Sequence, residues 1–274
     1  MRLKPKLILT NLSLALMLVI SPIAQSKLLP KPATNASQLA ANRYDSSNDI
    51  FHPVYGKNGM VASEQGLATQ VGLDILKQGG NAIDAAVAVG FALAVVLPNA
   101  GNIGGGGFMV LHDDKTGKDV AIDFREIAPA KASRDMYLDN QGNVIDGKSL
   151  FTHDASGVPG TVAGMEYALK KWGTMPLSKV LEPAIQLADK GFIVSDVLAQ
   201  TLKEEKSTLG KWSSSKAIFF KNGEPLKSGD LLVQKDLAKS LRLIAKQGAK
   251  AFYQGEIATK IAKEMQSHGG TMTL

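Results

Sequence analysis

One arginine and a run of four glycines are the features of this sequence whose types and spacing point most directly to chemistry. The glycines are Gly104 to Gly107 in NIGGGGFMV, and Arg125 follows the strand-like run AIDF. At the end of a strand, a planar guanidinium can present two parallel hydrogen bonds to a carboxylate in a cleft. Consecutive glycines allow another backbone or a ligand to approach closely. Arg125 is therefore a candidate binding residue.

Both features also have purely structural explanations. The glycines can form a tight turn or a bulge at a sheet edge. Arg125 can form an ion pair with Asp123 or Glu126, and an exposed pair of this kind contributes little to stability. Nucleotide binding is excluded by the order of elements, because a P-loop and a dinucleotide fingerprint both place their glycines between a strand and a helix. Here a helical pattern precedes the glycines and a strand follows them.

Other chemistry has weaker support in the sequence. The chain has no cysteine, which excludes disulfides, thiolate nucleophiles and cysteine metal sites. Its four histidines are scattered without metal-binding spacing, so we expect no metal and no cofactor. The acidic pairs are expected to be solvated, and adjacent residues such as His153 and Asp154 do not make a catalytic triad, which is assembled in space. The acidic pairs are Asp113–Asp114 and Glu204–Glu205.

The elements that must position Arg125 begin with two predicted helices. The run from Ser63 to Gly80 has apolar residues on one face, with Ser63 as a possible N-cap and two glycines as the stop. The run from Asn81 to Pro98 is apolar all round, which is typical of a buried helix. Asn81 and Asp84 have the spacing of a capping box at its start.

A β-hairpin and further helices follow. The runs FMVLH and DVAIDF flank a turn-rich loop and predict a hairpin that ends beside Arg125. A second hairpin is predicted to join AIFF to DLLV. Helices are expected over 160–172, 178–190, 195–206, 234–247 and 256–267. Helices that flank a hairpin in this order favour an α+β fold over a doubly wound sheet.

The N-terminal region has the pattern of an export signal. In residues 1–26, three basic residues precede an apolar stretch, and small residues at Ala24 and Ser26 suit a signal peptidase. We therefore expect cleavage after residue 26, an exposed leader over 27–50, a folded part over 51–274 and a periplasmic location. Without the signal, the count is 31 − 3 = 28 basic against 25 acidic residues, which gives no support for nucleic-acid binding.

Three stretches carry a likeness to a known family. They are the run from Gly59 to Val110 with NIGGGGF, then AIDFREIAPAKASRDMYLD, and then SGVPGTVAGM. They resemble the large subunit of the γ-glutamyltransferases, or glutathione hydrolases, of the bacterial periplasmic type, and the likeness extends from Gly59 to the last residue. The resemblance implies an Ntn-hydrolase αββα sandwich, which is incomplete in this chain because the small-subunit strands are missing.

The resemblance also implies an activity and a site. Family members are precursors that cleave themselves, and the new N-terminal threonine takes the γ-glutamyl group of glutathione as an acyl-enzyme. Water or an acceptor amino acid or peptide then receives the group. The arginine of the FRE motif, which is Arg125 here, binds the α-carboxylate of the donor. No catalytic residue maps onto this chain. The rest of the large subunit and the small subunit would be its partners, and the 274 residues alone are expected to be inactive.

Two alternatives stay open at this point. The first is a related Ntn amide hydrolase, either a cephalosporin acylase or an enzyme of poly-γ-glutamate capsules. The second is a non-catalytic periplasmic protein from a truncated gene. The DFREIAPAKA match favours the γ-glutamyltransferase over the first alternative, and an in-frame continuation with a Thr-led segment beyond codon 274 would exclude the second.

Overall fold

The structure is a computed structural model that describes residues 55–274, and these residues form one compact unit. The predicted signal peptide at 1–26, the leader at 27–50 and the start of the folded part at 51 lie outside the described residues. Within the described part, no helix is long and apolar enough to cross a membrane.

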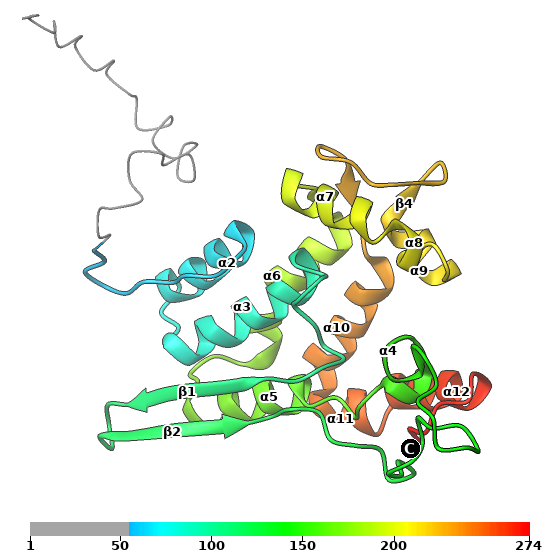
Figure 1. Cartoon of the computed structure of the whole chain (residues 1–274). Helices are drawn as coiled ribbons and strands as arrows, with labels where there is room; N and C mark the ends of the chain where they lie inside the picture. The colour runs from blue at the N-terminus through cyan, green and yellow to red at the C-terminus, as the bar shows by residue number, and fades with distance from the viewer. Residues whose placement is uncertain (1–54) are drawn as a thin grey trace, which may run out of the picture. The chain divides into compact units, whose positions relative to one another are not determined.

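Five helices build the core. They are α2 (Gly66–Lys77), α3 (Ala82–Val96), α5 (Thr161–Trp172), α6 (Leu177–Lys190) and α10 (Lys235–Gln247). Helix α3 contacts α2, α5 and α6, and α6 contacts α10, so α3 lies at the centre of the layer (Figure 1). The buried side chains of these helices form one continuous cluster. The predicted helices are thus confirmed here, with bounds that differ by one residue at most for α5, α6 and α10.

The capping box predicted for α3 is confirmed. The Asn81 side chain accepts hydrogen bonds from the backbone of Ile83 and Asp84, and the Asp84 carboxylate accepts the Asn81 N–H at 2.7 Å. Because α3 is built from alanine, valine and other apolar residues, most of its surface can pack closely against neighbours. This explains its central position.

Helix α2 starts later than the sequence pattern predicts. Its N-cap is Gln65, whose side-chain oxygen accepts from the first backbone N–H groups, so Ser63 as the cap is wrong. The Ser63 hydroxyl instead donates to the Gln65 carbonyl at 2.9 Å. The predicted glycine stop is confirmed, because Gly79 has a φ of 88° and the Gly80 N–H bonds the Ile75 carbonyl at 3.0 Å.

The first predicted hairpin is confirmed. Strand β1 (Phe108–Asp113) pairs antiparallel with β2 (Lys118–Asp123), and Phe108 lies opposite Asp123. Leu111 and Ile122 are buried against the helices, whereas Val110 on the other face is 80% exposed. The hairpin therefore covers the helical layer with one face only. Together with the helices it gives the α+β class that the sequence predicts.

The second predicted hairpin is wrong. Most of AIFF belongs to helix α9 (Ser213–Phe219), and the short strand β4 (Phe220–Lys221) pairs with β5 (Glu224–Pro225). The Asn222-Gly223 turn between them has φ values of 54° and 84°, the conformation of a tight two-residue hairpin. This turn closes the hairpin too early for DLLV to join it. Strand β6 (Leu231–Leu232) instead pairs with the two-residue strand β3 (Phe192–Ile193).

The remaining elements are helical. Helix α12 (Glu256–Ser267) has the predicted bounds, whereas the predicted helix over 195–206 is divided into α7 (Asp196–Glu204) and α8 (Lys206–Leu209). Short segments that the pattern did not predict are α4 (Lys148–Phe151), the 3-10 helix η1 (His153–Ala155) and α11 (Ala249–Tyr253). Long irregular stretches connect β2 to α5 through α4 and η1.

Candidate functional site

Arg125 lies just beyond the end of β2, and its side chain is open to solvent. Its backbone N–H donates to the Asp123 carboxylate at 3.0 Å, which holds the main chain at the strand end. The Arg125 side chain is 66% exposed, and its Nε lies 4.0 Å from the Glu126 carboxylate. Its carbon lies 5.9 Å from the centre of the Phe108 ring. No side chain in the described part of the protein hydrogen-bonds this guanidinium, so its fork stays available to a carboxylate.

The glycine run packs directly against the backbone that carries Arg125. Gly107 and Phe124 exchange two backbone hydrogen bonds, which extends the β1–β2 ladder to the residue before Arg125. At Gly106, a side-chain Cβ would lie 2.6 Å from the Phe124 carbonyl oxygen and 2.7 Å from the Arg125 Cα. Real Cβ atoms do not come so close to backbone. The run therefore serves the close backbone approach that the sequence suggested.

The start of α5 joins the same cluster. The backbone N–H groups of Gly160 and Thr161 both donate to the Gly105 carbonyl, at 2.7 and 3.0 Å. The Asn102 side-chain oxygen accepts from the Gly105 N–H at 2.7 Å and from the Thr161 hydroxyl at 3.0 Å. Three of these bonds tie the glycine loop to the start of the helix, and the bond from Gly105 to Asn102 lies within the loop.

Two glycines, the N-cap of α5 and one residue within the helix, allow α5 to pack closely against Phe124. A Cβ on Gly160 would collide with the Phe124 carbonyl, and one on Gly164 would collide with the Phe124 ring. Tyr253 of α11 supports the helix start from the other side, because its hydroxyl donates to the Pro159 carbonyl at 2.9 Å and accepts the Ala163 N–H at 3.2 Å. Burial raises the pKa of Tyr253, which keeps it a donor at neutral pH.

The sequence pattern indicated Arg125 and the glycine run but missed the residues that position them. Asn102, Gly160, Gly164 and Tyr253 come from distant parts of the chain. The GVPG run before α5 was the only local signal, since closely spaced glycine and proline mark a backbone with special geometry.

A cavity of about 370 Å³ begins one residue after Arg125. Glu126, Pro129, Tyr137 and the η1 segment line it, and Arg125 itself does not. Its volume is in the range of small-molecule sites. The strand end thus stands at the rim of a hollow that is bounded by the connection between β2 and α5.

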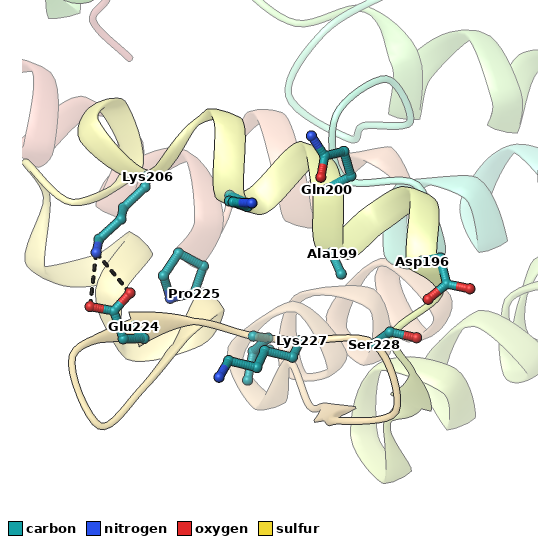
Figure 2. A pocket seen from close by; sticks show the side chains of 10 residues that line it. Asp196, Ala199, Gln200, Lys206, Glu224, Pro225, Lys227 and Ser228 are labelled. Carbon is teal, nitrogen blue, oxygen red and sulfur yellow. Dashed lines mark hydrogen bonds and ion pairs between the residues drawn. The ribbon is translucent and has the colours of Figure 1, made fainter.

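A larger cavity of about 620 Å³ lies elsewhere, between α7 and the segment around β5 (Figure 2). There Lys206 forms an ion pair with Glu224 at 2.7 Å, so its charge is neutralised within the cavity wall. In Figure 1, α7 and β4 lie at the far end of the described part from the β1–β2 hairpin. Size alone therefore does not make this cavity the functional site.

The other candidates from the sequence have local roles or none. Asp113 accepts the Lys115 N–H at 3.1 Å and the Thr116 hydroxyl at 2.9 Å, as expected for a turn. Glu204 accepts the Gln200 amide at 2.7 Å on the surface of α7. In the described residues, His153 forms no hydrogen bond with the adjacent Asp154.

Two of the four histidines that are scattered along the sequence lie close together in space. The fold brings His153 next to His268 and Glu264, although 111 residues separate His153 from Glu264 along the chain. Local spacing gives only the i,i+4 pair of Glu264 and His268, and His153 joins this pair through the packing of η1 against the end of α12.

The fold and the site define an α+β chain whose glycine-packed strand end presents an arginine beside a cavity. Residues 68–274 match the family model described as Gamma-glutamyltranspeptidase, and the chain belongs to this family.

Individual relatives agree with this assignment. The chain is 62% identical over 231 residues to the glutathione hydrolase proenzyme of Escherichia coli (strain K12), covering 84% of this chain and 40% of that protein. It is 41% identical to the capsule biosynthesis protein CapD proenzyme of Bacillus anthracis, over 76% of this chain and 35% of that protein. The crystal structure of Helicobacter pylori gamma-glutamyltranspeptidase superposes with a TM-score of 0.79 at 54% identity.

Each alignment includes most of this chain but a smaller share of the relative. The superposition with the Helicobacter pylori structure includes 81% of this chain and 64% of that one. The chain spans about two fifths of the length of the Escherichia coli relative, with 40% covered. The likeness to solved members confirms the fold class that the resemblance implied, with this chain as an incomplete part of it.

Proposed function

We propose that the protein carrying this chain is a γ-glutamyltransferase that hydrolyses glutathione, and that Arg125 binds the α-carboxylate of the donor. The observation that carries the proposal is an exposed guanidinium on a backbone that close glycine packing holds in place. Membership of the family and the similarity to a glutathione hydrolase proenzyme support the substrate class.

The chemistry of the donor explains why binding of its α-carboxylate by a guanidinium is useful. A γ-glutamyl compound has a free α-carboxylate at one end and the scissile amide at the other. A bidentate guanidinium fixes the first end, so the amide meets its nucleophile in one orientation. In the proposed reaction, a threonine outside these residues attacks the amide, and water, an amino acid or a peptide takes the acyl group. Residues 1–274 expressed on their own are therefore expected to be inactive.

Substitution of Arg125 tests the proposal. In the protein produced from its native gene, Arg125→Ala should lower kcat/KM for γ-glutamyl-p-nitroanilide by about 100-fold or more, because two charged hydrogen bonds are lost. Arg134→Ala is the matched control, since the Arg134 side chain is 93% exposed and, among residues 55–274, pairs only with its neighbour Asp135 at 2.9 Å. Equal kinetics for the two variants would refute the role of Arg125.

The similarity to the capsule biosynthesis protein keeps a second substrate class in view. Glutathione, poly-γ-glutamate and glutaryl-cephalosporin should be compared as substrates of the native gene product. The identity of 62% to a glutathione hydrolase proenzyme, against 41% to the capsule protein, supports glutathione as the best of the three. Preference for either other substrate would overturn the substrate assignment without affecting the family.

The export signal supports a periplasmic location for this activity. N-terminal sequencing of the protein from a periplasmic extract is expected to begin at Lys27. A protein that keeps Met1, or that is recovered only in the cytoplasm, would contradict this part of the proposal.

A further inference from the structure

His153, Glu264 and His268 form a compact group of metal-ligating side chains outside the Arg125 site. The Nε2 of His153 lies 3.6 Å from Oε1 of Glu264, and the Nδ1 of His268 lies 3.2 Å from the same oxygen. The two imidazoles stack with centroids 4.8 Å apart and planes 12° apart. All three ligand atoms lie within 4.8 Å of one another. We propose that this group is a binding site for a zinc ion.

Zinc coordination matches these distances. Zinc binds imidazole nitrogen and carboxylate oxygen at about 2.0–2.2 Å, so two ligand atoms of a tetrahedral site lie about 3.4 Å apart. The two distances to Glu264 already have this value within a few tenths of an ångström. The Nδ1 of His268 also lies 3.1 Å from the backbone carbonyl oxygen of Glu264, so zinc binding requires this half-exposed side chain to rotate away from that contact. Two nitrogens and one oxygen suit zinc better than magnesium or calcium, which prefer oxygen ligands alone.

The elements around the group hold its members in place. Glu264 and His268 are four residues apart at the end of α12, so they lie on one face of the helix one turn apart. His153 is the least exposed member. Its ring and that of Trp212 form a T-shaped pair with their centroids 6.1 Å apart. Gly270 packs so closely against His153 that a Cβ there would lie 2.9 Å from the His153 Cβ. The backbone after α12 is therefore packed against the base of the His153 side chain.

The position of the group indicates what a bound ion would do. His153 belongs to the long connection between β2 and α5, and Glu264 and His268 belong to the C-terminal helix. The contacts of His153 with Glu264 and His268 place the η1 part of that connection beside the end of α12. An ion shared by the two segments would cross-link residues that are far apart in the chain and stabilise the folded state over the unfolded chain. This role is structural and does not depend on the proposed γ-glutamyltransferase activity.

Zinc titration of the native gene product, purified without a histidine tag, tests the site. Calorimetry should show a single zinc ion bound per chain. The melting temperature should rise by roughly 5–10 °C at a hundredfold excess of zinc over the Kd. His268→Ala and Glu264→Gln should each weaken binding by about tenfold or more. Both residues are exposed, so these variants are expected to fold.

His112→Ala is the matched control. His112 also pairs with a carboxylate, Asp119 at 2.8 Å, but the pair is on the hairpin surface, and no third metal-ligating side chain of the described residues joins it. Its loss should leave zinc binding unchanged. Absence of zinc binding by the wild-type protein, or equal binding by His112→Ala and His268→Ala, would overturn the proposal. The group would then be a hydrogen-bonded ion pair at the end of α12.

Discussion

Asp84 and Arg125 are both charged, and their surroundings differ in almost every respect. Asp84 is fully buried, and its carboxylate accepts hydrogen bonds from the Asn81 N–H, the Thr174 N–H and hydroxyl, and the Met175 N–H. Arg125 has an exposed guanidinium, whose nearest described carboxylate is 4.0 Å away. One charge is completely partnered within the protein, and the other is held only through its backbone.

The difference in hydrogen bonding indicates different roles: Asp84 stabilises the fold, whereas Arg125 is available to bind a ligand. Asp84 joins the start of α3 to the turn before α6, so its hydrogen bonds stabilise the helical layer. A binding arginine instead needs a fixed backbone and a free side chain, because internal partners would compete with the ligand. The predictions below test this contrast, beginning with the largest expected effect.

Asp84→Ala should destabilise the fold most. It leaves four donors without their acceptor in the core, and loss of a buried charged partner costs about 3–5 kcal/mol. Urea unfolding of the native gene product measures the change. Asp236→Ala is the control, because Asp236 is 89% exposed and pairs with Lys239 one turn away. That variant should change stability by less than about 0.5 kcal/mol. Similar losses for both variants would contradict the structural role of Asp84.

Gly106→Ala should affect both stability and donor binding. The new methyl group would overlap the carbonyl of Phe124 and the Cα of Arg125, and such overpacking costs about 1–3 kcal/mol. The movement of the Arg125 backbone should raise KM for the γ-glutamyl donor as well. Gly104→Ala is a close control in the same run, because a Cβ at Gly104 meets no atom within 4 Å. If the two alanine variants behave alike, the glycine run does not position the strand end.

Arg125→Lys should separate binding from stability. Lysine keeps the charge but has no planar fork, so kcat/KM for the donor should fall by about 10–100-fold. The urea midpoint should stay at the wild-type value, because the exposed guanidinium makes no hydrogen bond within the described residues. A clear loss of stability in this variant would show that Arg125 supports the fold in the way that Asp84 does.

The smallest effect expected is the loss of folding stability that follows protonation of Asp84 in acid. Burial raises the pKa of Asp84, but the hydrogen bonds from Thr174, Asn81 and Met175 outweigh burial and lower the pKa below its ordinary value. Asp84 therefore adds stability above the pKa of an unfolded aspartate, near about 3.9, and loses it as the pH falls through the folded value. Urea midpoints from neutral pH to strong acid should fall more steeply for wild type than for Asp84→Asn. Parallel curves would contradict this assignment.

The comparison also shows what a sequence can reveal about such sites. The capping box of Asn81 and Asp84 and the β1–β2 hairpin follow local rules, and both were predicted correctly. The second hairpin was wrong because a two-residue Asn-Gly turn closed first. The contacts of Asp84 with Thr174, of Gly105 with Gly160 and of His153 with His268 join segments that are far apart in the chain. No local periodicity or spacing encodes such contacts, so the sequence indicated Arg125 without the residues that hold it.

The central claim, that Arg125 recognises the α-carboxylate of the donor, is tested most directly with two substrates. The native gene product and its Arg125→Ala variant should be compared on γ-glutamyl-p-nitroanilide and on the analogue that lacks the α-carboxylate. If Arg125 binds the α-carboxylate, Arg125→Ala should lose about 100-fold in kcat/KM on the first substrate and almost nothing on the second. An equal loss on both substrates, or no loss on either, would contradict this claim.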